Sequence, residues 1–161
     1  MGYDFRAVEL KWQERWEREK RHEAEPDERR KFFITVAWPY PSGPMHVGHA
    51  RTYTFPDVIA RYKRLMGYNV LFPMGWHLTG SPIVGAVNRL KSGEEKFLGI
   101  AKNVYGMSDE DLGSINDPMD YARYFIDQSP MGYKKGMRSL GLSIDWSKEF
   151  TSITPSYSRE V

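Results

Sequence analysis

The order of residues 32–73 constrains the fold of this chain more than any other feature. The apolar and β-branched run Phe32-Phe33-Ile34-Thr35-Val36-Ala37 predicts a buried strand, and residues 47–65 predict a helix. Between them, residues 38–44 cannot form regular structure, because three prolines lack a backbone donor and a glycine frees the chain. Asn69-Val70-Leu71-Phe72-Pro73 predicts a second buried strand. Strand, helix and strand in this order predict a parallel β-α-β unit.

The N-terminal segment predicts an amphipathic helix over residues 4–20. Its apolar residues recur at spacings of three and four, namely Phe5, Val8, Trp12 and Trp16, and Asp4 is a suitable N-cap. We expect this stripe to pack on the body of the protein; the alternative is a partner-binding face. Residues 21–31 are charged and contain Pro26, which predicts a connector.

The two helices next to the predicted strands have recognisable signals. Residues 47–65 should be kinked or split at Pro56 and should end at Gly67. Their expected buried face comprises Ala50, Tyr53, Val58, Ile59, Tyr62 and Leu65. After the second strand, Ser81 should cap a helix that begins at Pro82 and runs to about Leu90. The predicted class is α/β, with a parallel sheet and flanking helices.

The later residues give weaker signals. Residues 92–116 are polar and Gly-rich, and we expect an insertion with little core. Asp117-Pro118 opens a helical stretch to about Leu140, weakened by Pro130 and Gly132. Residues 143–146 predict a short strand, and residues 147–161 a polar tail without a closing element. The expected domains are 1–31, a helix and connector, and 32–161, the first half of a Rossmann-like domain.

Composition excludes several classes of protein. The net charge of +2 argues against a strongly basic nucleic-acid coat, although Arg61, Lys63 and Arg64 gather locally. The absence of cysteine excludes disulfides and thiolate metal sites. No apolar run approaches the ~18 residues of a membrane span, and the N-terminal residues do not resemble a signal peptide. We expect a cytoplasmic protein with no membrane partner.

The histidines mark the expected site. His46 and His49 are three residues apart where the helix begins, so both rings can donate to one phosphate, and Gly48 allows close approach to the backbone. One alternative is that both rings bond to backbone. Another is a zinc site, but neither loop offers a Cys or a carboxylate, so we predict no resident metal.

The strand-end loops supply further candidates. Trp38 and Tyr40 are equally well explained as core aromatics or as the wall of a small apolar pocket. His77 lies in a Gly-flanked loop after the second strand, where ligand contact is one of two interpretations. Ala37 and Pro73 should lie at one sheet edge, with His46, His49 and His77 facing one cleft. We expect His22, in the charged connector, to be solvated.

These residues resemble the class I aminoacyl-tRNA synthetases, whose HIGH signature is similar to His46-Val47-Gly48-His49. The flanking segments resemble the same class, as do residues 57–64 and 67–77. Within the class, residues 76–80 and 141–147 are similar to the leucyl-tRNA synthetase family of archaeal and eukaryotic-cytosolic type. The resemblance runs over residues 3–160 and is strongest at 32–90.

The resemblance implies a reaction in which ATP, with Mg²⁺, and leucine form leucyl-adenylate, and the leucyl group passes to tRNA(Leu). By matching position, His46 and His49 would be catalytic and stabilise the ATP phosphates. Pro44, His46, Gly48 and His49 would bind ATP, with adenine against the Gly48 backbone. Trp38 and Tyr40 would line the leucine pocket, and His77 would lie at its amino-acid end.

The sequence also departs from that family. The K-M-S-K-S signature is absent, as are the editing and anticodon-binding parts. The resemblance therefore implies the N-terminal catalytic segment of a longer enzyme, with weak activity alone and with the remainder supplied by a second chain or a C-terminal part. One alternative is a non-ligating nucleotide- or leucine-binding module. Another is a different nucleotidyl transferase that uses no amino acid.

Overall fold

The computed structural model describes residues 2–160 and divides them into two compact units. The first unit comprises the described residues up to Ala37, then Val47–Met74 and Met137–Glu149. The second unit comprises Trp38–His46, Gly75–Gly136 and the residues from Phe150 onwards. The expected division at residue 31 stays a prediction.

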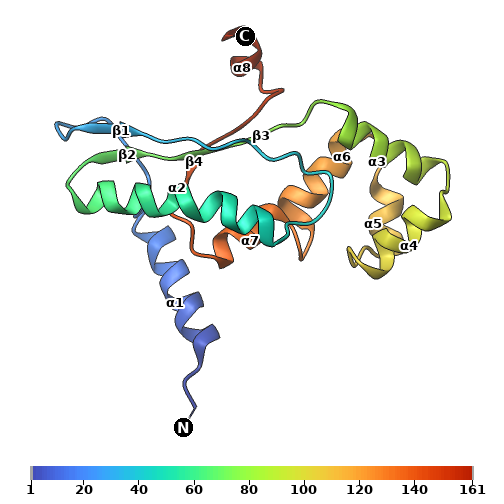
Figure 1. The fold of residues 1–161 in the computed structure, drawn as a ribbon, viewed down its shortest axis with the longest axis horizontal. Helices are drawn as coiled ribbons and strands as arrows, with labels where there is room; N and C mark the ends of the chain where they lie inside the picture. Colours follow the sequence, from blue (N-terminus) through green and yellow to red (C-terminus); the bar gives the residue numbers. More distant parts are fainter. Residues whose placement is uncertain (1, 161) are drawn as a thin grey trace. The chain divides into compact units, whose positions relative to one another are not determined.

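The elements follow one another in a largely α-helical chain with four short strands (Figure 1). The strands are β1 (Lys31–Phe33), β2 (Asn69–Leu71), β3 (Pro73–Trp76) and β4 (Asp145–Thr151). The helices are α1 (Phe5–Arg18), α2 (Val47–Leu65), α3 (Ser81–Lys91), α4 (Glu95–Asn103), α5 (Asp109–Ser114), α6 (Pro118–Arg123), α7 (Tyr133–Ser139) and α8 (Pro155–Glu160), with a π-helical segment, η1 (Tyr124–Gln128), after α6.

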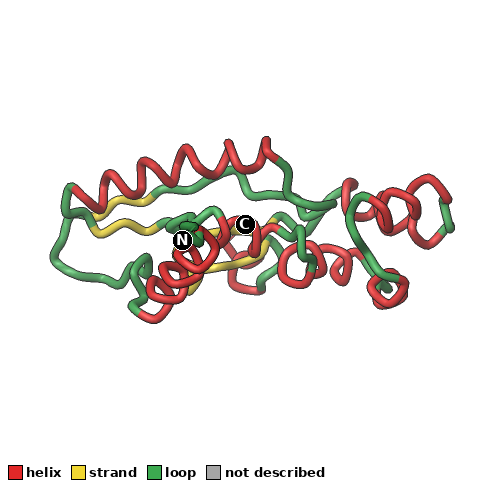
Figure 2. The backbone as a smooth tube through the Cα atoms, turned by 90° about the horizontal axis from the view of Figure 1, so that it is seen from below, coloured by secondary structure: helices red, strands yellow, loops and turns green. Residues whose placement is uncertain are grey.

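The predicted parallel pair is present in the first unit. β1 and β2 run parallel, with Lys31 opposite Asn69 and Phe33 opposite Leu71, and the pairing continues where Ile34 N donates to Leu71 O. α2 joins the two strands and lies along them, as both ribbon and tube show (Figures 1 and 2). The carboxyl ends of β1 and β2 therefore meet at one edge, as the sequence predicted. β3 and β4 form a second two-stranded sheet.

The predicted buried face of α2 was only partly correct, because Tyr53 is buried as expected but other members of that face are not. The helix buries Tyr53, Pro56, Asp57 and Ala60, whereas Val58, Tyr62 and Leu65 are exposed. A buried carboxylate decides this orientation: Asp57 accepts hydrogen bonds from Arg61 and from Ser143, so the polar side of the helix turns inward. The helix is also not split at Pro56, which lies inside it.

The N-terminal helix forms as predicted but packs less than expected. The Asp4 carboxylate accepts a hydrogen bond from Ala7 N at the start of α1. α1 buries no residue, and Trp12 is 40% exposed. Trp16, one turn from the end, contacts the rest of the first unit through His22 and Gly141. The expected packing of the stripe on the body of the protein is only partly present. Trp16 is half-buried and Gln13 donates to Ser139 O, whereas Phe5 and Trp12 are exposed.

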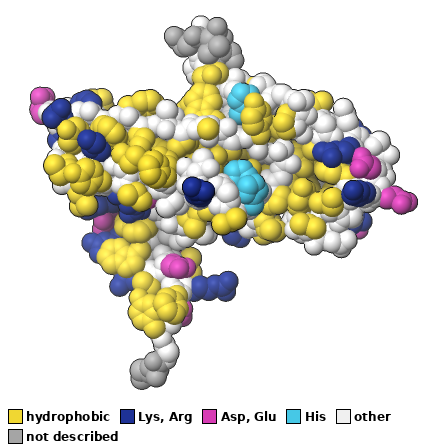
Figure 3. Space-filling model, in the orientation of Figure 1, with side chains coloured by type: hydrophobic (Ala, Val, Ile, Leu, Met, Phe, Trp, Pro, Cys, Tyr) yellow, Lys and Arg dark blue, Asp and Glu magenta, His cyan; other side chains and the backbone are white. Residues whose placement is uncertain are grey.

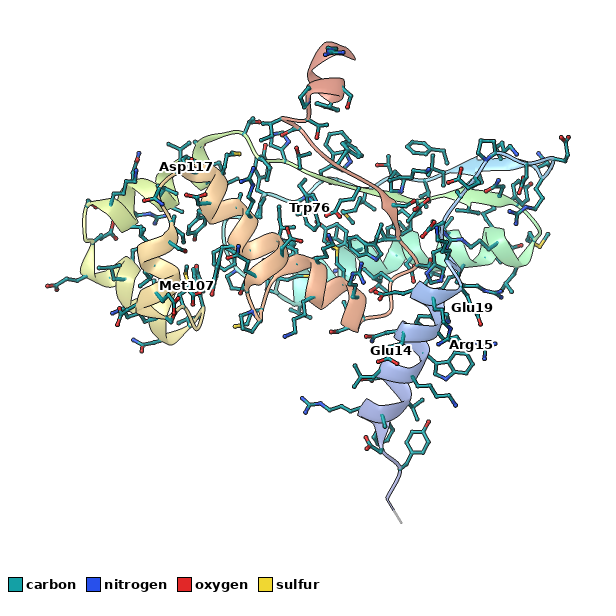
Figure 4. The ribbon with its side chains drawn as sticks, turned by 180° about the vertical axis from the view of Figure 1, so that it is seen from behind. Glu14, Arg15, Glu19, Trp76, Met107 and Asp117 are labelled. Carbon is teal, nitrogen blue, oxygen red and sulfur yellow. The ribbon has the colours of Figure 1, made fainter. Side chains whose placement is uncertain are left out.

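Residues 92–116 have more core than expected. Phe97, Ala101, Met107 and Ile115 are all buried in the second unit. Side chains cap α5 in this segment and α6 directly after it. Ser108 and Asp111 form a reciprocal capping box at α5, and Asp117 accepts from Met119 N and Asp120 N where α6 begins (Figure 4).

The helical stretch after Asp117 is interrupted where the sequence predicted weakness. The chain leaves the helix after η1 and resumes it in α7. Gly132 lies in the gap, where a Cβ would stand 2.7 Å from Phe125 O. α3 begins one residue earlier than expected, at Ser81, with Gly80 as N-cap.

The end of the chain is more ordered than predicted. The strand expected at residues 143–146 begins at Asp145 and continues to Thr151, and α8 follows it. The prediction of a tail without a closing element was wrong. No helix among residues 2–160 has the length and apolar character needed to cross a bilayer.

Candidate functional site

The first candidate site is the start of α2, in the first unit. Gly48 and His49 occupy its first turn, which carries no acidic residue, and Val47 is 86% exposed. The His49 ring stacks on the Tyr53 ring at 6.3 Å and 4°. Tyr53 is buried, and its hydroxyl donates to Ala37 O just after β1. The strand end therefore fixes Tyr53, and Tyr53 supports one face of the His49 ring.

This arrangement suits an anion. The positive end of the helix dipole lies at this terminus, and the first turn of α2 carries no acidic residue. Thr52 donates its hydroxyl to Gly48 O within this turn. His46 and Pro44 belong to the second unit, so joint action of His46 and His49 stays a prediction.

A second candidate site lies within the second unit, where two strand-end loops meet. The rings of Tyr40 and His77 are 4.2 Å apart at 47°, and His77 N donates to Pro39 O at 3.0 Å. His77 Nε2 is 3.2 Å from the hydroxyl of Thr79. Tyr40 is 40% exposed. The predicted neighbours Tyr40 and His77 are thus in contact and open to solvent, as a binding site requires.

Trp38 lies in an adjacent aromatic cluster. Its ring packs edge-on against Phe150 at 4.8 Å and Tyr157 at 5.4 Å. Gly75 lies beneath it, and a Cβ there would be 2.8 Å from the Trp38 ring. Of the two interpretations of Trp38, the structure shows packing in this cluster. A pocket role for its remaining exposed surface stays a prediction.

Buried tyrosines position the proline-rich loop. Tyr121 donates its hydroxyl to Ser42 O, and Tyr133 donates to Tyr40 O. Burial raises the pKa of both phenols, that of Tyr133 to about 12, so both remain donors at neutral pH. Met45 N donates to Met131 O and adds a third attachment. α6 and the segment entering α7 therefore hold the loop that carries Tyr40.

Sequence reasoning missed several residues of this region. Ser152 N donates to Trp76 O, and its hydroxyl accepts from Leu78 N, so Ser152 clamps the chain on both sides of His77. Trp76 itself is buried (Figure 4). Phe150, Ser152 and Tyr157 belong to the segment expected to be a polar tail. The short spacing of aromatic and hydroxyl side chains in that segment was the available signal that it packs against the rest of the chain.

A buried polar network anchors α2 in the first unit. Asp57 Oδ1 accepts from both the backbone N and the hydroxyl of Ser143 at 2.6 Å, and Oδ2 accepts from Arg61 at 2.8 Å. Arg64 donates to the Ser143 hydroxyl and carbonyl. α2, which carries Gly48 and His49, is thereby tied to the chain entering β4.

His22 is not the solvated residue that the sequence predicted. It is half-buried beside Trp16, with ring centroids 5.8 Å apart. Burial, reinforced by the guanidinium groups of Arg64 and Arg61, lowers the pKa of His22 to about 4. The ring is therefore neutral at physiological pH and belongs to the packing of the first unit.

The described residues contain no group of three or more His, Cys, Asp or Glu side chains placed to hold a metal ion. The two candidate sites present imidazole, hydroxyl and aromatic groups.

Comparison with known proteins agrees with this chemistry. Residues 11–161 match the family "tRNA synthetases class I (I, L, M and V)". Leucine--tRNA ligase of Pyrococcus abyssi is 49% identical over 161 residues, and that of Methanopyrus kandleri is 47% identical over 152. The alignments cover 97% and 94% of this chain but 16% of each relative.

A solved structure has a similar fold. The structure is the ternary complex of Agrobacterium radiobacter K84 agnB2 LeuRS-tRNA-LeuAMS, with a TM-score of 0.73 and 29% identity. The alignment covers 97% of this chain and 17% of that chain. The likeness confirms the predicted α/β architecture. The chain is homologous to the N-terminal catalytic portion of leucine--tRNA ligases and belongs to the class I tRNA synthetases.

Proposed function

We propose that this chain supplies the amino-acid and ATP site of a leucine–tRNA ligase. The reaction joins the leucine carboxylate to the α-phosphate of ATP, which releases pyrophosphate, and the leucyl group then passes to tRNA(Leu). The main support is the contact between the rings of Tyr40 and His77, with the Thr79 hydroxyl beside His77. This contact brings together the proline-rich loop and the loop after β3, which would form the amino-acid end of the site.

The second unit suits the leucine end. Tyr40 offers an aromatic wall, and the Trp38 cluster beside it is apolar. His77 is a polar group beside that apolar surface, as recognition of a charged amino group next to a branched side chain requires. In a pocket of this kind, the binding free energies of two side chains that differ by one methyl-sized group differ by only about 1–3 kcal/mol.

The start of α2 suits the ATP end. Gly48 has no side chain, so an adenine ring could approach the backbone closely. His49, held by Tyr53, would donate to a phosphate oxygen as negative charge develops, and His46 and Pro44 would complete the set. Mg²⁺ would arrive with ATP as part of the substrate. A cytoplasmic location also stays a prediction.

The test is leucine-dependent exchange of pyrophosphate into ATP, measured for each of the twenty amino acids. Because the chain spans about 16% of its relatives, it is assayed alone and also in place of the matching N-terminal segment of the Pyrococcus abyssi enzyme. Exchange that requires leucine supports the proposal. His49→Ala should lower the exchange rate by about 10²–10³-fold with little change in leucine affinity.

Two outcomes would count against this function. Binding of leucine or ATP without exchange in the hybrid enzyme would favour the non-ligating binding module. Nucleotide transfer that ignores every amino acid would favour a different nucleotidyl transferase.

A further inference from the structure

Two neighbouring cavities lie in the first unit, apart from both candidate sites. The first has a volume of about 250 Å³ and lies between the end of α1 and residues 138–147. The second has a volume of about 260 Å³ and lies between residues 21–29, the end of α2 and β2. Arg21 and Glu23 line both, so the two cavities adjoin. Together they reach the size of small-molecule sites, which is about 300–1,000 Å³.

The first of these, the aromatic cavity, is lined by the half-buried indole rings of Trp16 and Trp146 and by His22. The Arg61 guanidinium lies over the Trp16 ring, 5.8 Å from its centroid. The Arg138 guanidinium lies over the Trp146 ring at 5.2 Å. Because cations already lie against both indoles, they would repel a cationic ligand, and the aromatic surface suits a planar ring without positive charge.

The second, the cationic cavity, is lined by three guanidinium groups, of Arg21, Arg29 and Arg64, and by one carboxylate, of Glu23. Arg29 pairs with Asp27 at 2.6 Å, so its charge is compensated at the surface. The charges of two arginines then stand against the single Glu23 carboxylate. The cavity therefore keeps an excess of positive charge and suits an anion.

The two remaining arginines lack a partner of opposite charge. Arg64 donates to the hydroxyl and the carbonyl of Ser143, which are uncharged. Among the described side chains of the first unit, no carboxylate forms an ion pair with Arg21 or Arg64. Burial, reinforced by these guanidinium groups and that of Arg61, lowers the pKa of His22 to about 4. The positive charge is thus felt inside the aromatic cavity as well.

We propose that the two cavities form a binding site for a nucleoside monophosphate, with the planar base in the aromatic cavity and the phosphate at Arg21 and Arg64. Arg21 lines both parts, as a ligand that carries a ring and an anionic group on a short linker requires. The same chemistry is offered by a free mononucleotide and by a nucleotide within single-stranded RNA.

This site is distinct from the proposed ATP site. Arg64 lies in the last turn of α2, and His49 lies in its first turn. The rise of an α-helix separates the two positions by roughly 22 Å. The inference therefore goes beyond the proposed function and does not depend on it.

The test follows the indole N–H signals of the ¹⁵N-labelled chain, with Trp16→Phe and Trp146→Phe assigning two signals among the five tryptophans. AMP should shift both signals. It should bind about tenfold or more tightly than adenosine, which lacks the phosphate, or ribose 5-phosphate, which lacks the base. Binding of AMP at the start of α2 is followed separately, at the amide signals of Gly48 and His49. Indole signals that AMP leaves unchanged, or equal affinities for AMP and ribose 5-phosphate, overturn the proposal.

A matched pair of variants tests the role of Arg21. Arg21→Gln should weaken AMP binding at the indole signals about tenfold and leave adenosine binding unchanged. The control Arg18→Gln removes the same charge from the last turn of α1, where Arg18 lines neither cavity, and should have little effect. Both arginines are exposed, so neither change disturbs the core. Unchanged AMP affinity in Arg21→Gln, or equal weakening in both variants, contradicts the proposed site.

A single-stranded tetra-adenylate distinguishes the two sources of the ligand. Binding that is tighter than that of AMP, and that Arg21→Gln weakens, assigns the site to a nucleotide within RNA. Binding that is no tighter assigns it to a free mononucleotide. Because the readout is at Trp16 and Trp146, a chain without leucine-dependent exchange leaves this test intact, and the proposed function and this inference can fail separately.

Discussion

At the scale of single residues, buried polar side chains of the first unit determine which surfaces face inward. Asp57 is the clearest case, because it accepts three hydrogen bonds and lies on the helix that carries Gly48 and His49. Asp27 offers a comparison at the surface, where its carboxylate pairs with Arg29 and Lys31.

Asp57→Asn should lower the free energy of unfolding by about 2–3 kcal/mol, because the buried Ser143 donors and the partly exposed Arg61 lose a charged acceptor. The control Asp27→Asn should leave it nearly unchanged, because water replaces an exposed partner. Urea titration of both variants measures the difference. Equal losses would show that the Asp57 network contributes no more than a surface ion pair.

The half-buried His22 predicts a dependence of stability on pH. Its pKa falls from an ordinary value of 6.5 to about 4 on folding, so between these values the unfolded chain binds more protons than the folded one. The contribution of neutral His22 to the free energy of unfolding is therefore fully present above pH 6.5 and should be lost as the pH falls toward 4. The loss should be on the order of 1–2 kcal/mol, reduced from the full linkage value because the side chain is partly exposed.

Free energies of unfolding measured from pH 7.5 to 5 test whether stability falls as the pH falls. Most carboxylates titrate below this range and should contribute little to the change. His22→Gln should flatten the curve between pH 6.5 and 5. A curve of unchanged slope in that variant would assign the dependence to other groups.

At the scale of elements, strand β3 shows how a small residue permits close packing. Gly75→Ala would bring a Cβ within 2.8 Å of the Trp38 ring and 2.9 Å of Phe150. We expect a loss of about 1–3 kcal/mol from this overpacking. Gly85 is the control, because it lies in α3 with nothing within 4 Å of its Cβ position.

Gly85→Ala should stabilise the chain by about 0.5–1 kcal/mol, since alanine favours helix more than glycine does. Opposite signs for the two substitutions, measured by thermal unfolding, are the expected result. A neutral Gly75→Ala variant would show that Trp38 is free to move away from β3.

The elements also show what could be predicted from the sequence. The bounds of α2 were correct, because the proline-rich loop before it and Gly67 after it, with φ +82°, are local signals. Its buried face was predicted only in part, because Ser143, which donates to the buried Asp57, lies 86 positions later. The pairing of Tyr40 with His77 was predictable because both follow strands. The clamp by Ser152 was not, because it depends on the unexpected length of β4.

At the scale of the whole molecule, the first unit presents an apolar surface to solvent. Along α2 the exposed residues Phe55, Val58, Tyr62 and Leu65 recur at spacings of three and four, and they form one stripe opposite the buried face. Figure 3 shows hydrophobic side chains gathered where α2, β1 and β2 lie. Such patches favour association.

We therefore expect the purified chain to associate or to bind a dye that reports apolar surface. Sedimentation and dye fluorescence measure this, and Tyr62→Glu with Leu65→Glu should reduce both signals. A single sharp melt of a wild-type monomer that binds no dye would show that the stripe is compatible with a self-sufficient domain, and the binding-module alternative would then gain support.

The most direct test of the proposed site is a map of where a non-hydrolysable leucyl-adenylate analogue binds the ¹⁵N-labelled chain. The account predicts that amide signals of Tyr40, His77 and Thr79 shift with the leucyl analogue but not with adenosine, whereas those of Gly48 and His49 shift with both. Shifts at Tyr40 and His77 that are the same for both ligands, or that are absent while the analogue binds elsewhere, would contradict it.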